Sequence, residues 1–223
     1  MRGKLFGKAI FEFLTGVLLV GVMLFLPAGT FAYWQGWLLM GILFLPMLGA
    51  GLVLLWKSPE LLEKRLNADE KEEEQRVVLT LSALMFAAAF VVAGLNFRFG
   101  WIVLPAWVSY VAAAVFLLGY VLYAEVLREN TYLSRTVEVQ ENQKVIDTGL
   151  YGIVRHPMYM STFLLFFAMP FVLGSVISFV IMLAYIPLIA LRIRNEEKVL
   201  EEGLAGYKEY KKKVRYKVVP FLW

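Results

Sequence analysis

Four long stretches without a charged residue constrain this chain more than any other feature. They cover residues 13–56, 77–97, 99–124 and 157–191, and are 44, 21, 26 and 35 residues long. A helix needs about 20 apolar residues to cross the hydrocarbon core of a bilayer. The first and last stretches are each long enough for two crossings, and the middle two hold one each. The sequence therefore predicts an all-α integral membrane protein with five to six transmembrane helices.

Composition excludes several other classes of protein. The mean hydropathy of +0.67 is far above that of a soluble domain. The absence of cysteine excludes a disulfide-stapled fold, and a single histidine argues against a metal site or a mechanism with several histidines. The net charge of +4 needs no nucleic acid, because a cytoplasmic membrane face carries a basic excess.

Turn signals and basic residues predict the topology. Pro170 and Gly174 mark a tight reversal, so the last two crossings should form a helical hairpin. Of the 22 basic residues, 21 fall on one side of the predicted crossings, with only Arg98 opposite. Both termini should therefore be cytoplasmic, in a prokaryotic cell membrane or the endoplasmic reticulum. The predicted spans are residues 10–28, 34–56, 77–96, 101–126, 158–171 and 174–193.

Polar residues concentrate in two stretches that flank the hairpin, residues 125–156 and 192–223. If the hairpin enters the membrane and returns, both stretches meet at one surface and form one composite site. The first should hold a short strand at 136–140, paired with 144–146 across a turn near residues 141–142. Pro157 then opens a helix, where Arg155, His156 and free backbone N–H groups would form an anion site beside Tyr159.

The second stretch carries paired acids on an amphipathic helix. Glu197 shares the face of Ile193 and Leu200, and Glu196 lies about 100° round the helix. A buried carboxylate needs a cation, either an arginine such as Arg192 or a cationic ligand. Each stretch alone is also typical of plain capping or ion pairing. Together they suit a ligand with a carboxylate, an amine and a charged sulfur, such as S-adenosyl-L-methionine, although the charges alone do not single it out.

The run GLYGIVRHPMY at 149–159, followed by NEEKVLEEGLAGYKEYKKKVRYKVVPF at 195–221, resembles the isoprenylcysteine carboxyl methyltransferase family. That family belongs to a wider group with the phospholipid N-methyltransferases, and the likeness covers about residues 130–221. The resemblance implies a membrane-embedded methyltransferase with a cytoplasmic S-adenosyl-L-methionine pocket. It divides the chain into N-terminal transmembrane helices, 1–127, with a charged loop at 58–76, and a methyltransferase region, 128–223.

The same resemblance assigns the site residues. Arg192 would orient the methyl acceptor, with Arg155 as the alternative for this role, and Gln143 stands where the family commonly has a histidine. The cofactor-binding positions are Gln143, Val145, Gly149, Tyr151, Arg155, His156, Tyr159, Glu196 and Glu197.

The acceptor stays open at this point. A lipophilic carboxylate such as a prenylcysteine, entering from the bilayer, fits best, because an ionised carboxylate needs no base. A phospholipid amine or a small thiol is the alternative. A non-enzymatic membrane transporter or scaffold is the alternative of another class, and a sterol-reductase-like membrane protein is a lesser one.

Overall fold

The computed structural model describes residues 2–66, 73–134, 137 and 139–223. These residues are helical or irregular, with no strand among them. The helices are α1 (Arg2–Ala28), α2 (Trp34–Lys57), α3 (Pro59–Leu66), α4 (Glu73–Phe99), α5 (Ala106–Glu129), the 3-10 helix η1 (Gly149–Gly152), α6 (Pro157–Val172), α7 (Val176–Met182), α8 (Tyr185–Gly203) and α9 (Tyr207–Lys213).

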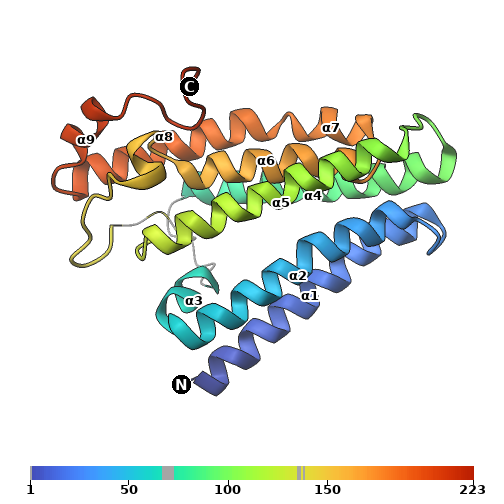
Figure 1. Cartoon of the computed structure of the whole chain (residues 1–223), viewed down its shortest axis with the longest axis horizontal. Helices are drawn as coiled ribbons and strands as arrows, with labels where there is room; N and C mark the ends of the chain where they lie inside the picture. The colour runs from blue at the N-terminus through green and yellow to red at the C-terminus, as the bar shows by residue number, and fades with distance from the viewer. Residues whose placement is uncertain (1, 67–72, 135–136, 138) are drawn as a thin grey trace.

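The long helices form an elongated bundle with its polar segments gathered at one end (Figure 1). At the opposite end lie the short turns that join α1 to α2, α4 to α5 and α6 to α7. α5 packs along α6, and α4 contacts α1, α7 and α8. α3, α9 and both termini lie toward the polar end, where the cytoplasmic segments were expected to meet.

Five helical segments are long and apolar enough to cross a membrane, which confirms the predicted fold class. They are α1, α2, α4, α5 and the combined segment Val176–Gly203, whereas α6 has 16 residues. Many large apolar side chains face outward, and Leu18 is 66% exposed. In water such a surface would be costly, so this exposure is that of a lipid-facing bundle.

The reversal between α6 and α7 lies where the sequence predicted it. Gly174 adopts φ +71°, a left-handed conformation that glycine tolerates. The Ser175 hydroxyl accepts a hydrogen bond from the Ser178 amide and caps α7. The Asn96 side-chain amide donates to the Gly174 carbonyl at 3.3 Å, so the N-terminal half of the chain also stabilises this turn.

The predicted last span, 174–193, lies within the candidate span Val176–Gly203 apart from its first two residues, and a short turn divides that segment into α7 and α8. Pro187 has no N–H to donate to the Leu183 carbonyl four residues earlier, and its ring clashes with that carbonyl in a regular helix. Residues 183–184 accordingly form a turn. The span predicted from residue 101 also begins later, since α5 starts at Ala106, after Pro105.

Two predicted cytoplasmic features lie partly outside the described residues. Of the strand expected at 136–140, residues 136 and 138 are not described, and its expected partner at 144–146 is irregular. The turn at residues 141–142 is confirmed: Asn142 has φ +59°, and the Gln143 amide donates to the Gln140 carbonyl at 3.1 Å. In the loop at 58–76, residues 67–72 of the acidic run are not described.

Candidate functional site

The start of α6 is fixed by the C-terminal tail. Val154 and Tyr216 form an isolated parallel bridge. The Arg155 amide donates to the Tyr216 carbonyl at 2.9 Å, and the His156 amide donates to the Lys217 carbonyl at 2.8 Å. His156 is the N-cap of α6, directly before the proline at its first position, as the sequence predicted. The tail therefore holds the Arg-His pair in place from outside the helix.

The buried Arg155 side chain connects α8 to the C-terminal tail. Its Nε donates to Glu197 Oε1 at 2.7 Å, with both side chains only 7% exposed. Its Nη1 donates to the Val214 and Arg215 carbonyls, each at 2.9 Å. The two polar stretches thus meet as expected, but these bonds direct the Arg155 guanidinium to protein partners. A buried ion pair with these additional hydrogen bonds fixes local geometry.

Two lysines, one from α9 and one from the tail, lie near the second carboxylate oxygen of Glu197. Its Oε2 lies 3.4 Å from Lys211 Nζ and 3.8 Å from Lys217 Nζ. Lys211 also forms a close ion pair with Glu201. The pKa of Lys211 is raised, chiefly by the hydrogen bond to Glu201 and also by Glu197, against a smaller opposing effect of burial. These contacts make Glu197 the centre of a structural charge cluster.

Glu196 has a different environment from its neighbour. Its Oε2 accepts a hydrogen bond from the Tyr159 hydroxyl at 2.6 Å, and that hydroxyl accepts one from Arg192 Nε at 3.0 Å. His156 stands between the two acids, with Nδ1 3.9 Å from Glu196 Oε1 and Nε2 3.3 Å from Glu197 Oε1. The Glu196 side chain is 26% exposed. The Tyr159 hydroxyl therefore links the Glu196 carboxylate to the Arg192 guanidinium.

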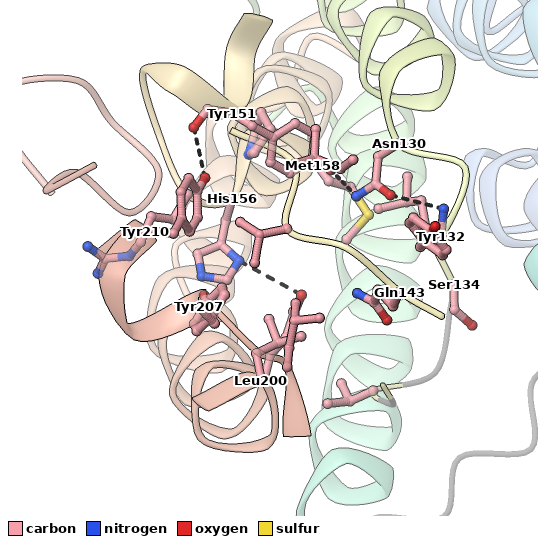
Figure 2. A pocket seen from close by; sticks show the side chains of 18 of the residues that line it. Asn130, Tyr132, Ser134, Gln143, Tyr151, His156, Met158, Leu200, Tyr207 and Tyr210 are labelled. Atoms are coloured by element: carbon pink, nitrogen blue, oxygen red, sulfur yellow. Dashed lines mark hydrogen bonds and ion pairs between the residues drawn. The ribbon is translucent and has the colours of Figure 1, made fainter. Parts of the chain in front are cut away.

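A pocket lies between this cluster and the connector that precedes η1 (Figure 2). Glu196 is among the described residues that line it, whereas Glu197 and Gly149 are not. In Figure 2, His156, Tyr207 and Tyr210 stand on one side, and Asn130, Tyr132 and Gln143 on the other. The predicted residues that line the pocket are Gln143, Val145, Tyr151, Arg155, His156, Tyr159, Arg192 and Glu196.

Gly149 supports the pocket without lining it. It has φ +52°, and a Cβ there would collide with the Glu129 carboxylate at the end of α5. The short helix η1 then presents Tyr151, whose hydroxyl accepts a hydrogen bond from Asn130 Nδ2 at 2.8 Å. The Tyr151 carbonyl accepts one from the Tyr210 hydroxyl, also at 2.8 Å. The glycine thus allows α5, η1 and α9 to close around one space.

Tyr207 carries an orphaned polar atom at this pocket. The residue is 4% exposed, and its hydroxyl is buried without a hydrogen-bond partner among the described residues. Burial raises the pKa of Tyr207 well above its usual value, and the charges of Glu197 and Glu196 add to the effect. The hydroxyl therefore remains protonated. A buried donor without a partner is costly, which is the state expected of a group that meets a ligand.

Sequence reasoning missed several of these residues. Asn130 and Tyr132 follow α5 directly and line the pocket, but no periodic pattern distinguishes them. Lys211 and Lys217 belong to a run whose pattern is typical of a solvated basic helix. Gln75, in the first turn of α4, has no exposed surface and bonds to Arg192. Its only sequence signal is an uncharged polar residue between the acidic run and a membrane span.

Fold and site together define an integral membrane protein with a polar pocket at one end of its helical bundle. The model of the phospholipid methyltransferase family matches residues 107–205, from α5 to the turn after α8. This match, over a little less than half of the chain, confirms the similarity to the wider group of isoprenylcysteine and phospholipid methyltransferases. The matched segment includes the Arg155–Glu197 pair but neither Gln75 nor the tail. No curated protein matches the chain.

Proposed function

We propose that this protein transfers a methyl group from S-adenosyl-L-methionine to a lipophilic carboxylate, such as that of a prenylcysteine. The observation that carries the proposal is the bridge made by the Tyr159 hydroxyl between Glu196 and Arg192, at 2.6 and 3.0 Å. It sets an anionic and a cationic group side by side in one pocket, at the polar end of an apolar bundle.

The donor set of the pocket fits this cofactor. Glu196 would accept from its ammonium group or face its positive sulfur, and His156 and Tyr159 would complete that side. The orphaned Tyr207 hydroxyl would donate to one of its polar atoms. Gln143, Val145 and Tyr151 line the same space, while Arg155, Glu197 and Gly149 would act by fixing it. When bound, S-adenosyl-L-methionine supplies a methyl group attached to a sulfonium sulfur, and the remainder of the cofactor, S-adenosylhomocysteine, is the leaving group.

A carboxylate acceptor needs orientation more than it needs a base. It is already ionised at neutral pH, so one of its oxygens can form the new bond to carbon without losing a proton. Arg192 would hold the other oxygen and aim the nucleophile. The flanking apolar helices would keep water away from the reacting atoms. Arg155, which the sequence offered as the alternative to Arg192 in this role, would contribute by holding Glu197 and the tail.

A phospholipid amine is the second candidate acceptor, and the description of the matching family favours it. An ammonium group must lose a proton before it can attack. Glu196 or His156 would accept that proton, since both lie at the pocket. In this reading Arg192 would meet the phosphate of the headgroup instead of a carboxylate.

We also propose where the protein works. The charge distribution, with 21 basic residues on one side, supports cytoplasmic termini and a cytoplasmic pocket. The cofactor would then enter from the cytoplasm, and the acceptor would enter sideways from the bilayer. Residues 1–127 would anchor the protein, and residues 128–223 would supply most of the site.

Methyl transfer into defined acceptors tests the proposal. The purified protein in lipid nanodiscs is given methyl-labelled S-adenosyl-L-methionine with either N-acetyl-S-farnesylcysteine or phosphatidylethanolamine vesicles. We expect a labelled methyl ester from the first. A labelled amine from the second would shift the assignment to the phospholipid. No transfer to either acceptor or to a total lipid extract, together with no calorimetric binding of S-adenosyl-L-methionine, would overturn the enzyme assignment.

A further inference from the structure

Gln75 makes a two-point contact with Arg192. Its side-chain Nε2 donates to the Arg192 carbonyl at 3.3 Å, and its Oε1 accepts from Arg192 Nη1 at 3.1 Å. The amide of Gln75 has no exposed surface, and the two residues are 117 positions apart in the chain. One side chain thus contacts both the backbone and the guanidinium of the same arginine.

This contact extends the hydrogen-bonded line of the site into the N-terminal half of the chain. From Gln75 the line runs through the Arg192 guanidinium and the Tyr159 hydroxyl to the Glu196 carboxylate. Gln75 is not among the described residues that line the pocket, so it would reach a ligand only through Arg192. α4 lies outside the segment that matches the family model. α4 therefore contributes the Gln75 side chain to this hydrogen-bonded line.

We propose that Gln75 is a positioning residue that fixes the Arg192 guanidinium toward the methyl acceptor. The inference rests on the proposed function, in which Arg192 orients that acceptor. An arginine side chain has several rotatable bonds, and only hydrogen bonds or packing restrict its head group. The contact needs a donor and an acceptor on one side chain. Glutamine provides both, a glutamate at pH 7 provides only acceptors, and leucine provides neither.

The test compares kinetics with the acceptor that the wild-type protein methylates, whether N-acetyl-S-farnesylcysteine, phosphatidylethanolamine vesicles or the total lipid extract. For Gln75→Leu we expect kcat/KM for the acceptor to fall roughly tenfold to a hundredfold, because a misplaced guanidinium loses alignment. Gln75→Glu keeps the bond from the guanidinium and loses the bond to the carbonyl, so its loss should be smaller. Calorimetric affinity for S-adenosyl-L-methionine should stay close to that of the wild type in both variants.

Two controls separate positioning from general stability. Asn96→Leu removes the other buried amide of α4, which is at the far end of the helix and bonds to Gly174 and Ile102. It should lower the melting temperature without the kinetic loss. In an Arg192→Lys background, adding Gln75→Leu should cost little more, because the two changes break one interaction.

The outcomes distinguish the inference from the function on which it rests. Wild-type protein that neither binds S-adenosyl-L-methionine nor transfers a methyl group overturns both. Active wild-type protein with unchanged kinetics in Gln75→Leu overturns the positioning role alone. An equal kinetic loss in Asn96→Leu, or fully additive losses in the Arg192→Lys background, would also overturn that role and leave the proposed function intact.

Discussion

At the scale of single residues, the two adjacent acids of α8 have separate environments. Glu197 is 5% exposed and binds Arg155 Nε at 2.7 Å, with Lys211 and Lys217 on its other oxygen. Glu196 is more open and accepts from the pocket-lining Tyr159 hydroxyl. One helical step of about 100° thus separates a structural carboxylate from one that can face a ligand.

Neutralising each acid should separate stability from binding. Glu197→Gln strands the buried Arg155 charge, so we expect a loss of about 3 kcal/mol in the free energy of unfolding. Glu196→Gln should leave the melting temperature nearly unchanged. It should weaken S-adenosyl-L-methionine binding roughly tenfold or more, because a charge-assisted hydrogen bond is lost. Thermal melting and calorimetry on both variants check this, and the reverse pattern would contradict the assignment of the two acids.

Two tyrosines of α9 provide a matched pair of substitutions. Both are buried, but the Tyr210 hydroxyl donates to the Tyr151 carbonyl, whereas the Tyr207 hydroxyl has no partner among the described residues. Tyr210→Phe should cost about 1 kcal/mol of stability. Tyr207→Phe should leave the ligand-free protein as stable or more stable, and should reduce the rise in melting temperature that S-adenosyl-L-methionine causes. Equal destabilisation by both changes would show that the Tyr207 hydroxyl has a structural partner.

At the scale of elements, local signals predicted what depends on local chemistry. Long apolar runs located the membrane helices, Pro157 marked the start of α6, and Gly174 marked the reversal. The break between α7 and α8 is also local, and Pro187 is its signal in the sequence. The bridge of Val154 with Tyr216 and the contact of Gln75 with Arg192 could not be predicted in this way. They join positions far apart in the chain, which only tertiary packing brings together.

η1 depends on a glycine that no other residue can replace cheaply. Gly149→Ala places a Cβ against the Glu129 carboxylate at a positive φ. We expect a loss of at least ~1 kcal/mol from backbone strain, and weaker cofactor binding because Tyr151 is displaced. Gly41→Ala is the control, since a Cβ at that position of α2 meets nothing within 4 Å. Thermal melting should show destabilisation only for Gly149→Ala. Equal stability of the two variants would show that position 149 does not require glycine.

At the scale of the whole molecule, the short turns and the candidate site lie toward opposite ends of the helical bundle. The short turns between membrane helices lie at one end, and the site, α3, α9 and the termini lie toward the other (Figure 1). This separation agrees with the distribution of basic residues along the chain, which predicts one basic end. The N-terminal helices are more than an anchor in this arrangement, because α4 contacts α7 and α8 and contributes both Asn96 and Gln75.

The proposed orientation can be tested cleanly because the chain has no cysteine. Lys212→Cys places a thiol at an exposed position of α9, and Val103→Cys places one in the exposed turn between α4 and α5. With a membrane-impermeant maleimide, intact cells should label only the Val103→Cys protein, and permeabilised cells should label both. The cysteine-free parent reports the background. Labelling of only Lys212→Cys in intact cells would place the pocket on the opposite face, where S-adenosyl-L-methionine made in the cytoplasm could not reach it directly.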